Sequence, residues 1–121
     1  MLIALALSLA LLGEQPETVM ITLHAKAGAE QALADVLARH YATARRLNLL
    51  APDAPHVTLR STDGADTRDF VEIMTWRDAE TPDHAPKEIL AIWQEMNALV
   101  EPRGGQPGLT ITEMVPLERA K

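Results

Sequence analysis

The stretch FVEIMTWRDAETPDH, residues 70–84, decides how the rest of the chain is interpreted. Its first part, Phe70 to Trp76, is rich in β-branched and aromatic residues and is typical of a strand. An acidic turn follows, and His84 stands where a helix is expected to begin. Large apolar side chains occur at both odd and even positions of the strand, and successive side chains point to opposite faces of a sheet. Both faces of the sheet are therefore expected to meet apolar partners.

The flanking segments complete the pattern of elements. Residues 18–25, 56–61 and 108–117 alternate with period two and are predicted as three more strands. Residues 29–47 and 85–100 repeat apolar side chains at three- and four-residue steps, which predicts two amphipathic helices. The predicted order of elements is therefore βαββαβ.

Local signals support the predicted boundaries. Asp63-Gly64 is expected in the hairpin before the stretch that begins at Phe70. Asp83 is a candidate cap for the second helix, and Pro86 falls in its first turn, where a missing N–H is not needed.

This order predicts a ferredoxin-like α+β fold, because right-handed crossovers place both helices on one face of a four-stranded antiparallel sheet. Parity divides the strand residues between the two faces. The side chains expected to face the helices are Val19, Ile21, Leu23, Val57, Leu59, Val71, Ile73 and Ile111. The opposite face is expected to carry Met20, Phe70, Met74, Trp76 and Met114. Because that face is too apolar to leave in water, a homodimer joined sheet to sheet is expected.

Composition limits the classes of partner. The chain has 121 residues, is 47 % hydrophobic and fits one compact domain. Its formal net charge of −6 comes without a run of Lys or Arg, which argues against nucleic acid or an anionic membrane surface as partner. The absence of cysteine excludes disulfides, thiolate metal sites and a cysteine nucleophile.

An apolar run from Leu2 to Leu12 precedes the predicted domain. A spanning helix needs about 20 apolar residues and a secretory signal roughly 7 to 15, so an export signal is expected, although no Lys or Arg precedes the run. An apolar arm that packs on a partner, or a start codon assigned too far upstream, are the alternatives. We expect residues 1–15 to lie outside the fold and residues 16–121 to form the domain, periplasmic or secreted and otherwise cytoplasmic, without a membrane span.

On the strand that ends F-V-E-I-M-T-W-R-D-A-E, and on the histidine that follows it at the second helix, the chain resembles the antibiotic-biosynthesis-monooxygenase type of dimeric α+β barrel. The resemblance covers Thr18 to Leu117. It implies a group that includes cofactor-independent monooxygenases of aromatic polyketides, haem-degrading enzymes, signal-molecule-modifying proteins and members without an assigned reaction. It also implies a pocket between helices and sheet and, for an enzyme, O₂-dependent oxidation with no bound cofactor.

Four residues are candidates for such a pocket. His84, beside a helix N-terminus, is expected to hold a neutral imidazole that can accept a proton, or else to be a surface residue. Trp76 can stack on a planar ligand, whereas its parity with the methionines favours an anchor in the dimer interface. Tyr41 and Trp93 lie on the helix faces toward the sheet, where they are either core or lining of the pocket implied by the resemblance.

His24, Arg60 and Glu72 are assigned by parity to the face away from the helices. We expect an Arg60–Glu72 bridge with His24 at the rim, or alternatively a catalytic cluster of these residues. His24 is also a candidate for ligand binding. His24, His56 and Glu72 are possible metal ligands by type, but no two of them share a diagnostic spacing, so no metal site is predicted.

For the haem-degrading branch, the resemblance asks for an asparagine on the first strand, a tryptophan on the third and a histidine on the second helix. Trp76 and His84 match in type, but the first strand offers Thr22 and His24 instead of asparagine. The sequence therefore favours a dimer that binds a small apolar or aromatic molecule, as a cofactor-independent monooxygenase. The alternative is a non-enzymatic ligand-binding or interaction dimer.

Overall fold

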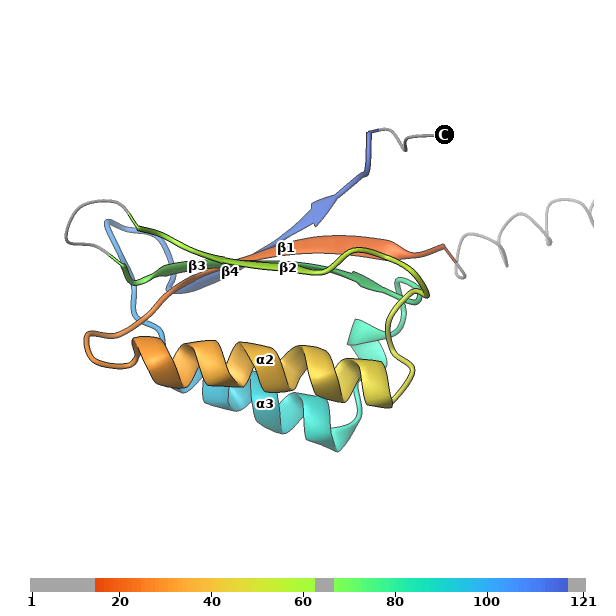
Figure 1. The fold of residues 1–121 in the computed structure, drawn as a ribbon, viewed down its shortest axis with the longest axis horizontal. Coiled ribbons are helices and arrows are strands. Elements are labelled where there is room, and N and C mark those ends of the chain that lie inside the picture. The colour runs from red at the N-terminus through yellow and green to blue at the C-terminus, as the bar shows by residue number, and fades with distance from the viewer. Residues whose placement is uncertain (1–14, 63–66, 118–121) are drawn as a thin grey trace, which may run out of the picture.

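The computed structural model describes residues 15–62 and 67–117, and within them it has the predicted ferredoxin-like α+β order. The elements are β1 (Glu17–His24), α2 (Glu30–Arg46), β2 (Val57–Arg60), β3 (Asp69–Trp76), the 3₁₀ turn η1 (Pro82–His84), α3 (Lys87–Ala98) and β4 (Leu109–Met114). Both helices lie against one face of the sheet (Figure 1). The Asp63-Gly64 turn and the apolar run at the start of the chain lie outside the described residues.

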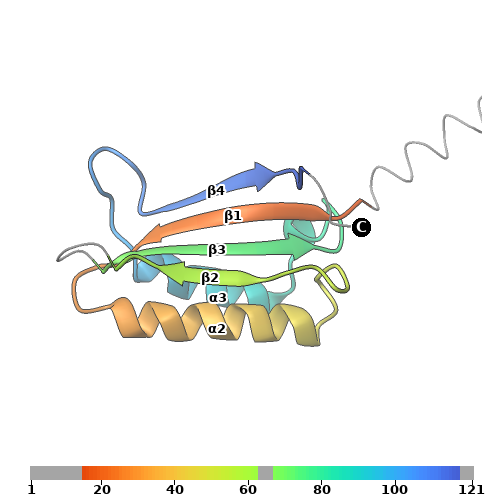
Figure 2. The ribbon, with the colours of Figure 1, turned by 45° about the horizontal axis from the view of Figure 1, so that its top comes forward.

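The sheet is antiparallel, with the strand order β2-β3-β1-β4, so the two central strands come first and third in the chain (Figure 2). β3 pairs with β1 along its whole length, from Glu17 opposite Trp76 to His24 opposite Asp69. These two pairs mark the opposite ends of the central sheet. No helix in the described ranges is long and apolar enough to cross a membrane.

Helix α2 follows the predicted range closely. Gly28 has φ +85°, a left-handed conformation that ends β1 and turns the chain into the helix. Glu30 lies in the first turn of α2, and Arg45 and Arg46 lie in its last turn. Each charge therefore interacts favourably with the helix dipole.

Helix α3 begins later than predicted. Ala85 and Pro86 are extended, with ψ of 139° and 164°, and the helix starts at Lys87. Asp83 makes no capping hydrogen bond, because it lies with His84 in the separate turn η1. The predicted cap at Asp83 is therefore wrong.

The predicted faces of β2 and β3 are also wrong. Directly opposite residues in an antiparallel pair point to the same face, and Val19 pairs with Met74 while Ile21 pairs with Glu72. The residues of β3 that face the helices are therefore Phe70, Glu72, Met74 and Trp76, all of them buried. In β2, Val57 and Leu59 pair with Ile73 and Val71, and all four lie on the outer face of the sheet.

The error has a physical cause. Both parities of β3 carry large apolar side chains, and the single charge at Glu72 suggested that its parity faced water. Instead, Glu72 is fully buried among hydrogen-bond partners. Trp76 is 3 % exposed beneath the helices, so its predicted role as an anchor between sheets is wrong as well.

No helix among the described residues covers the outer face of the sheet (Figure 1). Its apolar side chains are Met20, Val57, Leu59, Val71, Ile73 and Met114. Val57, Leu59 and Met114 are 39–55 % exposed. An apolar outer face is thus present, and Met20 and Met114 lie on it as predicted. Residues Val57, Leu59, Val71 and Ile73 take the place of the predicted Phe70, Met74 and Trp76.

Candidate functional site

A cavity of about 270 Å³ lies between strands β1 and β4 and helix α3. We call it the tryptophan cavity, because Trp76 from β3 and Trp93 from α3 form part of its wall. Their rings meet edge to face, with centroids 6.2 Å apart and planes at 82°. The other lining residues are Glu17, Val19, Ile21, Pro82, Met96, Asn97, Leu109, Ile111 and Glu113. The wall is mostly apolar, as ligand pockets generally are.

Two carboxylates, Glu17 and Glu113, line this cavity. Glu113 pairs with Val19 across the β1–β4 ladder, and Glu17 stands two residues before Val19 on the same face. Partial burial raises the pKa of Glu17, and its hydrogen bond to Glu113 and the negative charges of Glu113 and Asp83 raise that pKa further. Glu17 is therefore suited to exchange a proton with a ligand in the cavity.

Behind the tryptophans lies a buried polar network. Nε1 of Trp93 donates a hydrogen bond to Nε2 of His40 at 3.0 Å. Because an indole N–H can only donate, Nε2 of His40 carries the lone pair and Nδ1 carries the proton. Nδ1 then donates to Oε1 of Glu72 at 2.9 Å, while Nε2 of His56 lies 2.8 Å from Oε2 of Glu72. We call His40, Glu72 and His56 the Glu72 clamp.

The clamp satisfies an otherwise costly group. The side chains of His40 and Glu72 are fully buried, and an unpaired charge in such a place costs several kcal/mol. Both oxygens of Glu72 have an imidazole partner. The edge of Trp76 also meets the ring of His40, with centroids 6.1 Å apart, so the clamp is packed directly against the wall of the tryptophan cavity.

A second cavity, of about 530 Å³, lies on the far side of the clamp. We call it the loop cavity, because residues 50–56 form much of its wall, between the C-terminal end of α2 and the end of β3. His56 and Tyr41 both line it. Their rings stack, with centroids 3.8 Å apart and planes at 14°.

The predicted site residues are thus divided between different places. Trp76 and Trp93 line the tryptophan cavity together, whereas Tyr41 lines the loop cavity. His84 is exposed in η1 and lines none of the cavities described here. Since His84 precedes α3 by three residues of chain, the expected effect of the helix dipole on its imidazole loses its basis.

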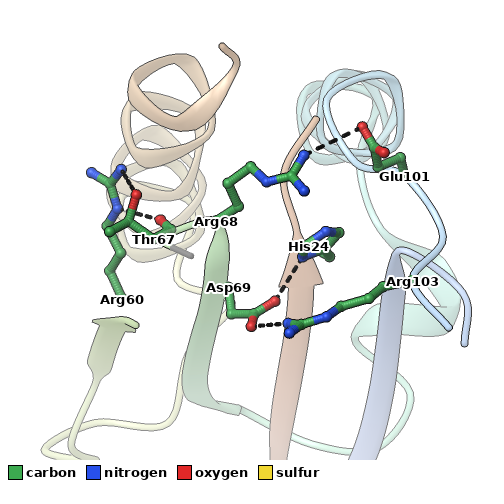
Figure 3. A network of polar contacts seen from close by, with 7 residues as sticks. All are labelled: His24, Arg60, Thr67, Arg68, Asp69, Glu101 and Arg103. Carbon is green, nitrogen blue, oxygen red and sulfur yellow. Dashed lines mark hydrogen bonds and ion pairs between the residues drawn. The ribbon is translucent and has the colours of Figure 1, made fainter. Parts of the chain in front are cut away.

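His24 lies at the other end of the sheet from Trp76. Its Nδ1 is 2.7 Å from Oδ1 of Asp69, and Arg103 contacts the other carboxylate oxygen (Figure 3). Burial alone would raise the pKa of Asp69, but the hydrogen bonds and charges of Arg103 and His24 outweigh it and lower that pKa. His24 therefore belongs to a structural cluster with Asp69 and Arg103, which has its own cavity of about 300 Å³ away from the tryptophans.

The predicted Arg60–Glu72 bridge does not form. Nε of Arg60 donates to the carbonyl oxygen of Thr67 at 2.6 Å (Figure 3), while Glu72 points into the core and binds His40 and His56. The sequence offered one signal for the clamp, a histidine in the buried stripe of the first helix and an acid on the neighbouring strand.

The described residues hold no group of three or more His, Asp or Glu side chains arranged to bind a metal ion. His24 and His56, weighed together as ligands, are engaged with different acids, Asp69 and Glu72. The haem-degrading branch would require a histidine facing a haem in the tryptophan cavity. His84 is exposed elsewhere, and both ring nitrogens of His40 are engaged, so the residues present do not fit a haem.

Replacing His40 with alanine is expected to destabilise the protein by about 3–5 kcal/mol, because Glu72 would keep its charge in the core with one partner fewer. Urea unfolding at pH 7 measures the change. The control is Arg39→Ala, the preceding residue of α2, whose pair with Glu95 is exposed to solvent and should contribute far less to stability. If both variants lost the same free energy of unfolding, the Glu72 clamp would contribute no more to stability than an exposed ion pair.

Glu17→Gln tests the raised pKa of Glu17. A carboxyl whose pKa is raised on folding contributes stability that is present below its unfolded pKa and is lost as the pH rises through its folded pKa. The melting temperature of Glu17→Gln should therefore match wild type near pH 3.5, to within about 1 °C, and exceed it at pH 7.5.

Glu95→Gln is the control with the opposite sign. The hydrogen bond from Arg39 lowers the pKa of Glu95 despite partial desolvation, so this variant should lose stability at pH 7.5 and recover in acid. If the melting temperature of Glu17→Gln changed with pH in the same direction as that of Glu95→Gln, the raised pKa of Glu17 would be contradicted.

Comparison with known proteins adds structural neighbours but no close relative. No protein-family model and no curated protein matches the chain. Rv0793 from Mycobacterium tuberculosis superposes with a TM-score of 0.66 at 17 % identity, covering 88 % of this chain and 100 % of that one. SnoaB from Streptomyces nogalater, described as a cofactor-independent oxygenase, gives 0.66 at 19 % identity over 86 % and 95 % of the two chains.

A third solved structure, described as an antibiotic biosynthesis monooxygenase, superposes with a TM-score of 0.64 at 16 % identity over 84 % of this chain and 99 % of that one. At such identities the likeness concerns the fold. This chain therefore has the ferredoxin-like α+β fold of the antibiotic-biosynthesis-monooxygenase-like proteins, as its resemblance to them implies.

Proposed function

We propose that this protein binds a small, flat, apolar molecule in the tryptophan cavity and oxidises it with O₂. The observation that carries the proposal is the combination of two tryptophan walls with a carboxyl of raised pKa in one cavity. An apolar cavity with few polar groups is the usual form of a small-molecule site. The similarity to SnoaB, a cofactor-independent oxygenase, supports oxidation as the reaction.

The size and walls of the cavity limit the substrate. A volume of about 270 Å³ suits a molecule of one to three fused rings. Aromatic rings in proteins pack edge to face or offset. The rings of Trp76 and Trp93 lie at 82° to each other, so an aromatic ligand could pack against the face of one indole and the edge of the other. An aromatic compound therefore fits better than a branched aliphatic one.

The proposed reaction begins with removal of a proton from an acidic C–H of the substrate by the carboxylate of Glu17. For a CH₂ group between aromatic rings, the balanced change is R₂CH₂ + O₂ → R₂C=O + H₂O. Two C–H bonds are broken, one oxygen atom becomes the new carbonyl, and the other leaves as water. The substrate supplies all four electrons, so no further reductant is needed.

A non-enzymatic ligand-binding protein is the second candidate, and one observation favours it. The titratable groups that line the tryptophan cavity are carboxylates, Glu17 and Glu113, while His40 is sealed behind Trp93. Binding without turnover is the behaviour that this alternative predicts.

The proposal includes a homodimer joined through the outer face of the sheet. Val57, Leu59, Ile73 and Met114 leave apolar area open to water on that face. Apolar area of this kind on a soluble protein marks an interaction surface, and a second copy offers the same surface in return.

The substrate class can be tested with anthrone, which carries a CH₂ group between two aromatic rings. Anthrone should quench the tryptophan fluorescence, and the protein should convert it to anthraquinone above the spontaneous rate, with one O₂ consumed per product. Ile111→Trp should weaken binding by about tenfold or more, because the larger ring fills the cavity from the exposed edge of β4.

Leu90→Trp is the control for added aromatic volume, because Leu90 is 46 % exposed on α3 and lines none of the cavities described here. It should leave anthrone binding and turnover unchanged. Binding with no oxidation would support the non-enzymatic candidate. Oxidation that survives Ile111→Trp in full would place the reaction outside the tryptophan cavity.

The dimer predicts twice the chain mass in sedimentation equilibrium. Val57→Glu should raise the dissociation constant by at least about a hundredfold, since it places two charges in an apolar interface. Leu90→Glu, on the exposed face of α3, should leave the mass unchanged. A monomer in wild type, or a dimer that tolerates Val57→Glu, would rule out this interface.

A further inference from the structure

The loop cavity has a chemistry of its own. The ionisable side chains that line it are Tyr41, Arg45, Asp53, His56 and Arg77. Two guanidinium groups therefore face one carboxylate, although the whole chain has a formal net charge of −6. Arg45 has no ion-pair partner among the described residues. Nη1 of Arg77 donates to the carbonyl oxygen of Asn48 at 2.9 Å, and Nε of Arg77 lies 3.5 Å from Oδ2 of Asp78.

The cavity exists because the loop cannot continue the sheet. The N–H of Ala51 donates to the carbonyl oxygen of Thr75, so the loop first pairs with the end of β3. Pro52 and Pro55 then lack the N–H groups needed to extend that ladder, and Asp53 has φ 61°. The chain bulges away from β3 and rejoins it only at Val57, and the gap has a volume of about 530 Å³, within the usual range for ligand sites.

His56 is held in this cavity in one orientation. Its Nε2 is fixed by Glu72 at 2.8 Å, and its ring is stacked on Tyr41. Nδ1 has no hydrogen-bond partner among the described residues, and the imidazole is 17 % exposed. A fixed ring with one unused nitrogen at a cavity wall is an arrangement that can receive a ligand.

The Glu72 clamp determines which nitrogen of His56 faces the cavity. Nε2 of His56 faces Glu72, so the ring nitrogen that a ligand in the cavity can reach is Nδ1.

We propose that the loop cavity is a second ligand site, which binds a small organic carboxylate. His56 and the guanidinium of Arg45 bind the carboxylate group, and Arg77 adds a further positive charge. Leu50, Pro52, Pro55 and Met74 supply apolar wall for the body of the ligand. This site is separate from the tryptophan cavity, so the proposal does not depend on the proposed function.

The test is titration of the full chain with benzoate at pH 6.5 and low salt, followed by calorimetry and by the ring resonances of His56. Saturable binding is expected below about 10 mM benzoate, with a shift of the His56 signals. Arg45→Gln and His56→Gln should each weaken binding about tenfold, because each removes one hydrogen-bonding group that faces the carboxylate.

Two controls make the result specific. Arg46→Gln changes the neighbouring residue, which pairs with Glu88 and does not line the cavity, so binding should stay within about twofold of wild type. Ile111→Trp blocks the tryptophan cavity and should leave benzoate binding unchanged. Loss of binding in Ile111→Trp would assign benzoate to the other cavity and overturn the proposal.

Inorganic phosphate distinguishes the carboxylate from anions in general. Phosphate should bind more weakly than benzoate, since it cannot use the apolar wall. Binding of phosphate in preference to benzoate would refute the carboxylate class. Equal losses in Arg45→Gln and Arg46→Gln, or no saturable binding at all, would refute the site.

Discussion

The rest of the structure depends on the burial of one carboxylate. Glu72 stands on a central strand, points toward the helices and is fully removed from water. Such a group is tolerated only when both oxygens are matched by donors, and His40 from α2 and His56 from the chain before β2 provide them. The clamp thereby ties helix, strand and loop together on the inward face of β3.

This constraint also organises the two cavities. His40 meets Trp93, which lines the tryptophan cavity, while His56 lines the loop cavity. The same carboxylate therefore stands behind both walls. On the first side it leaves a sealed, apolar surface suited to a flat ligand. On the second side it orients an imidazole beside two arginines, which suits an anion.

The architecture could be predicted from the sequence because the periodicities of β1, α2 and β4 are clear and each element buries one face. The face of β3 could not, since Phe70, Met74 and Trp76 compete with Val71 and Ile73, and only pairing with β1 decides between them. The charge of Glu72 suggested that its side chain faces solvent. It is buried instead, because its hydrogen-bond partners His56 and His40 come from positions 16 and 32 residues away in the sequence.

The candidate site was predicted only in part for the same reason. Trp76 and Trp93 share a cavity, but the two extended residues Ala85 and Pro86 separate His84 from α3. Glu17 was missed because its pKa is raised by burial and by Glu113, which lies on the far end of the chain. Contacts between distant segments carry chemistry that local patterns do not reveal.

The protonation of the clamp is the most direct test of this account, and ¹⁵N NMR of the histidine rings measures it. His40 should be a neutral imidazole with its proton on Nδ1, protected from exchange, because Nε2 accepts from Trp93 and Nδ1–H donates to Glu72. A His40 ring protonated on Nε2, or one that exchanges freely with water, would contradict the buried clamp on which both proposed sites depend.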